Sequence, residues 1–490
     1  MTSDSAHPPL SPLPSPLSSE IIAELSWRGL VNQTTDDAGL GAWLAPRPRT
    51  IYVGFDPTSD SLHVGHLVAL MVLRRFQQAG HRPIALVGGA TGMIGDPSGK
   101  SEERNLLSVE ALQANIAGME PQLRRFLDFD CGANSAILVN NYDWMGRFGY
   151  LEFLRDVGKH VPVNVMLTKD SVRSRLERSD AGLSYTEFSY MLLQAYDFVH
   201  LYQQYGCELQ AGGSDQWGNI TAGIDLARRL LSVQLYGMTC PLLTKSDGTK
   251  MGKTESGALW LSPDKTSPYE FYQYWINVDD ADVGKCLRYF TDLSREEIEG
   301  LLVRHQADAG RREAQRRLAA ELTRLVHGEE GLRNAEKTTS VLFPSVDLWA
   351  AQTPGPVTLP KAAPWWLSPA AAELSPPVQT EKEPSESGGG TESSRLTDSQ
   401  LAEIYAHVPT AELPRDRLLG TGLSIIDAFV ESGLCKTKSE ARRIIGQGGA
   451  YVNNRRVDDA YARLGPADLA SESIMVLRTG KKKYALLRFQ

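Results

Sequence analysis

The stretch from Thr50 to His66, TIYVGFDPTSDSLHVGH, constrains the fold of this chain more than any other. Apolar residues alternate with smaller or polar ones from Ile51 to Phe55, which is typical of a strand, and the Asp-Pro-Thr that follows breaks it. Asp60 or Ser61 is predicted to cap a helix with apolar residues along one face. The stretch therefore predicts a buried strand that leads into an amphipathic helix.

Two histidines lie at the start of this predicted helix. His63 and His66 are three residues apart, so they share one face at its N-terminus, where backbone N–H groups and the helix dipole favour anions. Gly65 between them leaves room for a nucleotide to approach the backbone. A phosphate site and an ordinary βα unit with two surface histidines are equally good interpretations of these residues alone.

The next strand, from Ile84 to Val87, completes a βαβ unit, so the chain is predicted to be an α/β protein with a parallel sheet and ligands at its carboxyl edge. The following loop, GGATGMIGDPSGKS, is not a P-loop, because that pattern needs glycine where Ile94 stands. It is either a tight bend or a bare backbone against which substrate packs. In the second case Asp96, Lys100 and Arg104 point inward.

Further polar groups interrupt apolar segments along the chain. Tyr190, Gln194 and Asp197 form one stripe on a mostly apolar helix, which is either a hydrogen-bonded core network or a site for an amino acid. Asp215 follows a strand and a pair of glycines, where it is either a helix cap or a ligand of ribose hydroxyls. The loop lysines Lys250 and Lys253 suit a clamp on pyrophosphate or a solvated turn.

Composition is that of a globular protein, with 42% hydrophobic and 22% charged residues in 490. Five scattered cysteines without a metal-ligand spacing indicate a reducing compartment and no structural zinc or disulfide framework. No apolar run reaches the length of a membrane span, and the start of the chain lacks the features of a targeting peptide. A cytoplasmic protein without membrane contact is expected.

The chain is expected to divide into five parts: a disordered leader (1–18), a catalytic domain (19–245), a loop and α-helical domain (246–350), a disordered linker (351–400) and a small RNA-binding domain (401–490). From Arg415 to Gln490 the chain has 14 Lys and Arg against 8 Asp and Glu. This basic tail favours a phosphate backbone, and the lack of an aromatic platform in its sequence argues for structured RNA over single strands. The candidate RNA contacts are Arg442, Arg443, Arg455, Arg456, Lys481, Lys482 and Lys483.

The motifs His63-Val64-Gly65-His66, Gly213-Ser214-Asp215-Gln216 and Lys250-Met251-Gly252-Lys253-Thr254, in this order, resemble the signatures of class I aminoacyl-tRNA synthetases. With a tail that resembles the S4 RNA-binding domain, the chain is similar to the bacterial type of tyrosyl-tRNA synthetase. The resemblance implies a Rossmann-like parallel-sheet domain, an α-helical domain and a small α+β S4-like domain. It also implies a homodimer that activates L-tyrosine with ATP and transfers it to tRNA(Tyr), with Mg²⁺ carried by ATP and no protein-bound metal.

The resemblance also implies roles for individual residues. The tyrosine-binding residues are Tyr52 and Asp197 at the phenol hydroxyl, and Asp96, Tyr190 and Gln194 at the ammonium group. The ATP-binding residues are Gly54, Asp56, Gly65, Gly213, Asp215, Gln216 and Lys253. The catalytic residues are Thr58, His63, His66, Lys100, Arg104, Lys250 and Lys253.

Three alternatives stay open. A tryptophanyl enzyme shares the fold, although Tyr52 and Asp197 favour a hydroxylated side chain. A non-catalytic RNA-binding relative keeps the tail and the fold, although intact histidines and lysines argue against that as its only role. A nucleotidyltransferase acting on another substrate keeps the phosphate site and lacks a basic tail.

Overall fold

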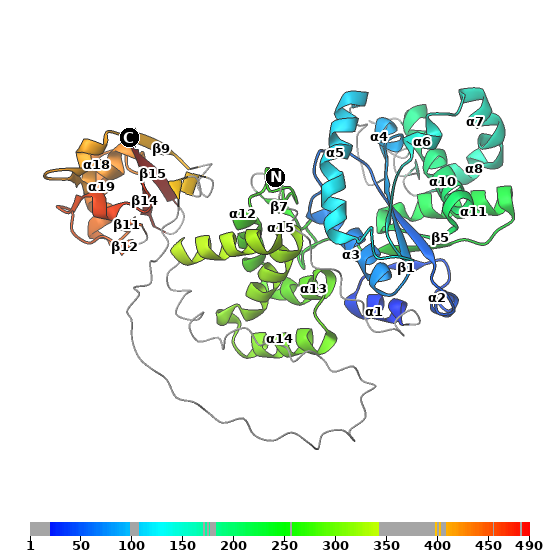
Figure 1. Cartoon of the computed structure of the whole chain (residues 1–490), viewed down its shortest axis with the longest axis horizontal. Coiled ribbons are helices and arrows are strands. Elements are labelled where there is room, and N and C mark those ends of the chain that lie inside the picture. The colour runs from blue at the N-terminus through cyan, green and yellow to red at the C-terminus, as the bar shows by residue number, and fades with distance from the viewer. Residues whose placement is uncertain are drawn as a thin grey trace, which may run out of the picture. The chain divides into compact units, whose positions relative to one another are not determined.

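A computed structural model describes residues 20–98, 107–169, 172–173, 176, 183–254, 257–342, 397–398, 401–402, 408–453, 455–480 and 483–490 (Figure 1). The predicted leader and nearly all of the predicted linker lie outside these residues. The chain forms two compact units, residues 1–333 and 334–490. Each is described by itself.

A six-stranded sheet forms the centre of the first unit. Its strands are β1 (Gln33–Thr34), β2 (Thr50–Phe55), β3 (Arg82–Val87), β4 (Ile137–Asn140), β5 (Cys207–Gly213) and β6 (Tyr236–Cys240). They are arranged in the order β1-β6-β5-β2-β3-β4, parallel except for β1, which runs antiparallel to β6. The chain leaves β2 toward β3 on one side and returns to β5 on the other. Ligand sites of parallel sheets form at such a point, beyond the carboxyl ends of the strands.

The longer helices around this sheet are α3 (Val64–Gln78), α5 (Val109–Phe126), α10 (Tyr185–Tyr205) and α11 (Trp217–Leu231). The shorter ones are α1 (Ile21–Arg28), α2 (Leu40–Leu44), α4 (Thr91–Ile94), α6 (Tyr142–Met145), α7 (Tyr150–Asp156), the 3₁₀ turns η2 (Gly158–His160) and η3 (Ser214–Gln216), and α8 (Val163–Leu167). The apolar faces of α10 and α11 pack on β-strand residues such as Tyr52 and Ile84, with Phe198 and Leu226 fully buried. This packing holds the start of α11 and the middle of α10 at the ligand edge of the sheet.

The N-cap of α3 differs from the prediction. His63, and neither Asp60 nor Ser61, is the cap: its backbone is extended, and its Nδ1 accepts from the N–H of Gly65 at 3.0 Å. Asp60 is paired with Lys265, and the Ser61 hydroxyl donates to the carbonyl of Leu62. Both favoured capping residues are thus engaged elsewhere, and the helix begins later than expected.

Helices form the rest of the first unit, after the short hairpin of β7 (Lys253–Thr254) and β8 (Gly257–Ala258). They are α12 (Pro268–Ile276), α13 (Asp280–Phe290), α14 (Arg295–Ala307), the 3₁₀ turn η4 (Ala309–Arg311) and α15 (Glu313–Leu342), which continues past the boundary at residue 333. Ser267 and Ser294 begin α12 and α14 with capping boxes. The guanidinium of Arg28 on α1 donates to the carbonyls of Thr291 and Leu293, at 3.0 and 2.7 Å. Buried donor groups thus join these helices to the sheet layer.

The second unit contains a five-stranded sheet, in the order β12-β11-β14-β15-β9. Its elements are β9 (Thr410–Leu413), η7 (Arg415–Leu418), β10 (Leu423–Ser424), α18 (Ile425–Glu431), α19 (Lys438–Gly446), β11 (Ala450–Val452), β12 (Arg455–Arg456), β13 (Arg463–Leu464), η8 (Pro466–Asp468), β14 (Ile474–Thr479) and β15 (Lys483–Phe489). One face of the sheet packs on α18 and α19 through Phe429, Ile445, Met475 and Leu487. The unit is a small α+β domain, as predicted.

None of the helices in the described part of the chain combines the length and hydropathy that crossing a bilayer requires.

Candidate active site

Asp197 lies on α10 inside the core of the first unit, 1% exposed. Its two carboxylate oxygens accept hydrogen bonds from Asn141 Nδ2 at 2.9 Å and Trp144 Nε1 at 2.8 Å. Burial raises the pKa of Asp197 to about 7, against the opposing effect of these two donors. In its ionised form, a carboxyl group held this way is well placed to accept a hydrogen bond from a hydroxyl group of a ligand.

Tyr52 on β2 lies beside α10, with its ring centroid 5.3 Å from that of Phe198. Its hydroxyl is buried and has no hydrogen-bond partner among the described residues. Gln210, which pairs with Tyr52 in the register of β2 and β5, has a buried Oε1 that also has no hydrogen-bond partner among the described residues. Burial and the charge of Asp197 raise the pKa of Tyr52 well above its usual value. Buried polar atoms normally have partners, so these two indicate a place for a polar ligand.

The residues predicted to bind the ammonium group belong to two hydrogen-bonded groups. The hydroxyl of Tyr190 donates to Asp56 Oδ2 at 3.0 Å, and the hydroxyl of Thr91 donates to Asp56 Oδ1 at 2.8 Å. Asp56, predicted as an ATP ligand, therefore lies against the amino-acid side of the site.

Asp96 belongs to the second of these hydrogen-bonded groups. Its Oδ2 accepts from Gln216 Nε2 at 2.6 Å, and Gln194 Nε2 donates to Gln216 Oε1 at 3.3 Å. Gln216, also predicted for ATP, thus joins two of the three ammonium candidates. The two carboxylates, Asp56 and Asp96, give this region the negative charge that an ammonium group needs.

The nucleotide candidates lie at the ends of β2 and β5. Gly54 is the exposed residue of an otherwise mostly buried strand. The Asp215 side chain packs against Gly213: a Cβ at position 213 would lie 2.5 Å from Asp215 Oδ1. Burial and the nearby Asp96 raise the pKa of Asp215, while Lys250 lowers it. The positive charge of Lys250 therefore acts on the carboxylate that is predicted to bind ribose.

The two histidines stack on each other with ring centroids 4.0 Å apart. His66 Nδ1 accepts from the backbone N–H of His63 at 3.1 Å, so its ring proton lies on Nε2. Burial and the neighbouring His63 lower the pKa of His66 to about 3, which keeps it neutral at pH 7. His63 also accepts through Nδ1, so its ring donates through Nε2. Gly65 is exposed beside them.

The segment 259–261, which follows the lysine loop, is bonded to the same end of α3. The N–H of Val64 donates to the carbonyl of Leu259 at 2.9 Å, and the N–H of Leu261 donates to Leu62 at 2.8 Å. Gly252, at φ +84°, lies so close that a Cβ there would be 3.2 Å from the Cβ of Val64. The loop and the histidines therefore form one side of the site.

Other predicted site residues are less informative. Thr58 is exposed, and its N–H donates to the carbonyl of Asp56 at 2.8 Å. Lys250 is exposed, and the backbone of Lys253 pairs with Ala258. Lys100 and Arg104 lie outside the described residues. Among the described residues, no group of three or more His, Cys, Asp or Glu side chains is placed to hold a metal ion.

In the C-terminal unit, Arg442 and Arg443 are exposed on α19, Arg455 and Arg456 on β12, and Lys483 at the start of β15. Lys481 and Lys482 lie outside the described residues. The described basic side chains come from a helix, a hairpin and a strand end.

Sequence reasoning did not assign site roles to Asn141, Trp144 and Gln210. Asn141 and Trp144 closely follow β4, and the signal that could have found them is their position at the end of a parallel strand. Their partner Asp197 lies more than 50 residues away, so a buried carboxylate in need of donors identifies them only after folding.

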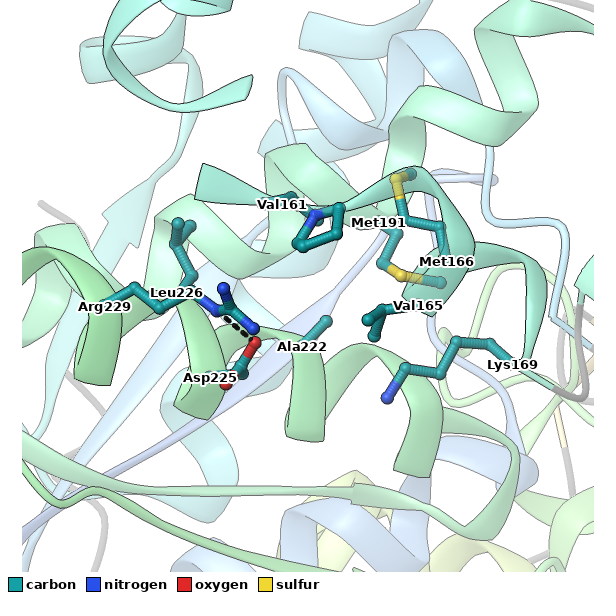
Figure 2. Close-up of a pocket in the computed structure, with 10 residues that line it drawn as sticks. Val161, Val165, Met166, Lys169, Met191, Ala222, Asp225, Leu226 and Arg229 are labelled. Carbon is teal, nitrogen blue, oxygen red and sulfur yellow. Dashed lines mark hydrogen bonds and ion pairs between the residues drawn. The ribbon is translucent and has the colours of Figure 1, made fainter. Parts of the chain in front are cut away.

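A separate cavity of about 260 Å³ lies on another side of α10, between α8 and α11. Figure 2 shows its apolar wall, including Met166 and Met191, with Lys169 and the ion pair of Asp225 and Arg229 at its edge. Met191 lines this cavity while its neighbour Tyr190 bonds to Asp56. The cavity and the candidate site therefore share a helix.

The pKa of Asp197 leads to a prediction about stability. Because this pKa is about 7 in the folded protein and near 3.8 in the unfolded chain, the folded state keeps a proton that the unfolded state loses between these values. The free energy of unfolding of the wild type, relative to Asp197→Asn, is expected to fall as pH rises from about 4 to about 7 and then to level off. Urea unfolding at pH 5, 6, 7 and 8 measures this difference. A difference that does not vary with pH would contradict the shift.

A parallel sheet with paired histidines and a lysine loop at its ligand edge defines a class I synthetase. The family described as tRNA synthetases class I (W and Y) matches residues 45–344, and the chain belongs to it. Within that family, residues 400–487 match the tyrosine–tRNA ligase SYY-like C-terminal domain.

Curated relatives support the narrower assignment. The chain is 55% identical to the tyrosine–tRNA ligase of Rhodopirellula baltica over 96% of both chains. It is 47% identical to that of Geobacillus stearothermophilus, over 96% of this chain and 100% of the relative. Among solved structures, a C-terminally truncated mitochondrial tyrosyl-tRNA synthetase from Aspergillus nidulans superimposes with a TM-score of 0.59 at 33% identity, covering 66% of this chain and 94% of that one.

Proposed function

We propose that the chain is a tyrosine–tRNA ligase, which activates L-tyrosine with ATP to tyrosyl-adenylate and pyrophosphate and then transfers tyrosine to the 3′ end of tRNA(Tyr). The observation that carries this proposal is the buried pair of Asp197 and Tyr52, whose polar groups suit a phenol hydroxyl. The tryptophanyl alternative offers no hydroxyl to this pair. We infer a cytoplasmic location from the same function.

The substrate tyrosine lies with its hydroxyl between Tyr52 and Asp197, and its ammonium group near Asp96, Tyr190 and Gln194. Its carboxylate is already a nucleophile, so the reaction needs no general base. Oxygen of the carboxylate attacks the α-phosphorus of ATP, and pyrophosphate leaves. The protein contributes positioning and stabilisation of negative charge.

The nucleotide lies across the ends of β2 and β5. Asp215 binds the ribose, and Gly54, Gly65 and Gly213 let the nucleotide approach the protein backbone. Thr58 from the loop after β2, His63 and His66 from the start of α3, and Lys250 from the lysine loop face the phosphates. Lys253, Lys100 and Arg104 are proposed as further cations. The Mg²⁺ that neutralises pyrophosphate arrives with ATP. The backbone bonds from residues 259–261 to the start of α3 support this arrangement, because the N–H of Leu259 also donates to the carbonyl of Gly252 and so connects the lysine loop to the histidines.

We propose the division of labour predicted above: residues 19–245 activate tyrosine, residues 246–350 carry the loop and a helical tRNA surface, and residues 401–490 bind RNA. The exposed basic residues of α19 and β12 support the last assignment.

Tyrosine-dependent exchange of labelled pyrophosphate into ATP tests the function, with phenylalanine and tryptophan in parallel. Exchange with tyrosine alone is expected, followed by charging of tRNA(Tyr) in a second assay. Exchange with tryptophan would support the alternative enzyme, and no exchange from folded protein would leave only an RNA-binding role.

We also infer a homodimer. Large apolar side chains that are 43–79% exposed gather on α7, α8 and the start of α10: Tyr150, Leu151, Val163, Leu167 and Tyr185. The hydroxyls of Tyr150 and Tyr185 are 3.4 Å apart, which joins α7 to α10. Contiguous apolar surface of this kind marks a protein interface.

Replacing Leu151 with Asp is expected to convert the dimer to monomer at micromolar concentration, because a charge at the centre of an apolar interface loses its hydration without gaining a partner. Sedimentation velocity measures the change. Val303→Asp on α14, a similarly exposed apolar residue away from α7 and α8, is the control and should remain dimeric. A Leu151→Asp protein that sediments like the wild type would place the interface elsewhere.

A further inference from the structure

A row of alternating arginine and tyrosine side chains crosses the outer face of the C-terminal sheet. The register pairs Arg456 with Tyr451, Tyr451 with Arg478, and Arg478 with Tyr484, across β12, β11, β14 and β15. Directly paired residues of neighbouring strands point to the same face of a sheet. These four side chains, which we call the Arg–Tyr row, therefore form one line across four strands.

The Arg–Tyr row faces away from the core. Its strand neighbours Ala450, Val452, Leu477 and Ala485 are buried on the opposite face, and Ala450, Val452 and Leu477 belong to the cluster around α18 and α19. Tyr451, Arg478 and Tyr484 are only partly buried, and Arg456 is exposed. The row is the accessible part of this face, since Val476 and Leu486 farther along it are buried, and Arg456 also pairs with Asp458 at 2.8 Å.

Arg478 lies between the two tyrosines. Its guanidinium carbon is 3.7 Å from the ring centroid of Tyr451 and 5.9 Å from that of Tyr484. One nitrogen, Nη1, donates to the carbonyl of Gly480 at 2.7 Å, whereas the buried Nε has no partner among the described residues. A charged group held over an aromatic ring is pre-organised, so little conformational freedom is lost when RNA binds.

Such a surface combines the two elements of single-stranded RNA recognition: aromatic faces on which bases stack, and cations that contact the neighbouring phosphates. The aromatic residues are more than 30 positions apart in the sequence, which is why the tail read in order shows no aromatic platform. The preference for structured RNA over single strands depends on the lack of such a platform in the sequence.

We propose that the Arg–Tyr row binds unpaired nucleotides of the tRNA, with one or two bases stacked on Tyr451 and Tyr484 and with Arg456 and Arg478 on the flanking phosphates. This inference rests on the proposed function, since it assumes that tRNA is the partner. It adds a contact to loop or bulge nucleotides to the backbone contacts made by the exposed arginines of α19.

The test uses the full-length protein and tRNA(Tyr) transcript, with the dissociation constant measured by fluorescence anisotropy over a series of salt concentrations. Tyr451→Leu and Tyr484→Leu remove the stacking face and keep an apolar strand residue. Each is expected to raise the dissociation constant about tenfold without changing the slope of log K against log salt. The Phe variants at both positions retain a ring and should bind like the wild type.

Tyr461→Leu is the matched control, because this tyrosine of the same domain is 82% exposed and lies outside the row. Arg456→Gln should instead reduce the salt slope by about one unit, as loss of a phosphate contact does. Thermal unfolding and pyrophosphate exchange, both expected to be unchanged, verify that the variants fold.

The outcomes separate the two proposals. If the wild type binds tRNA and the Leu variants bind within twofold of it, or if Tyr461→Leu weakens binding equally, the Arg–Tyr row is not the contact. If the Phe variants lose as much affinity as the Leu variants, stacking is excluded. If the wild type itself neither binds nor charges tRNA, the proposed function fails and the row is left without its partner.

Discussion

Asp197→Asn is expected to lower the ratio of kcat/KM for tyrosine over phenylalanine by about 100-fold or more. A site built to hydrogen-bond a hydroxyl rejects the analogue that lacks it, because the buried groups of the site are left unpaired. Tyrosine-specific synthetases as a class are the known example of this effect, with a discrimination of about 10⁵ against phenylalanine. The amide removes the charged acceptor while keeping nearly the same shape, so only part of that discrimination should be lost.

Pyrophosphate exchange with each amino acid measures the two constants. Most of the change should come from slower use of tyrosine, since phenylalanine makes no bond to Asp197. Asp225→Asn is the control, because Asp225 is a carboxylate of the neighbouring helix α11 that pairs with Arg228 and Arg229 outside the site. An unchanged ratio in Asp197→Asn would mean that this carboxyl group is a structural element of the core.

His63→Asn is expected to reduce kcat for adenylate formation by about 10²- to 10³-fold, the range seen when one donor to a developing oxyanion is removed. His63 has two separable tasks here. Its Nδ1 caps α3, and its Nε2 is the donor that we propose for the phosphates. Asn is itself a good N-cap, so this variant removes the second task and keeps the first.

His63→Ala removes both tasks and provides the comparison. It should lose a similar amount of kcat and in addition about 1 kcal/mol of stability, which urea unfolding detects. If His63→Asn turns over like the wild type and only His63→Ala is impaired, the histidine serves the helix and not the reaction.

Local patterns predicted much of the fold and the candidate site. Tyr190, Gln194 and Asp197 fall on one stripe because helical periodicity acts over a few residues, and the structure does bury Tyr190 and Asp197. Their partners could not be predicted this way. Each of the three bonds to a different element: Tyr190 to Asp56, Gln194 to Gln216, and Asp197 to Asn141 and Trp144.

The N-cap of α3 shows the same limit. Asp and Ser rank above His as capping residues, but Lys265 engages Asp60 from a segment far later in the chain. The Arg–Tyr row is also assembled from separate strands, so only sheet register reveals it. Intrinsic preference and short spacing are visible in a sequence, whereas pairing across the fold is not.

The bonds between residues 62–64 and 259–261 have a consequence for protein engineering. A loop of this kind is an obvious unit to exchange between proteins. Here, however, residues 259–261 pair through their backbone with residues 62–64, and a side chain at position 252 would have its Cβ only 3.2 Å from that of Val64. A chimera that takes its loop from another protein without the matching residues 61–64 is expected to lose the fit between these two segments, where small displacements break the backbone bonds. The loop and residues 61–64 should therefore be exchanged together.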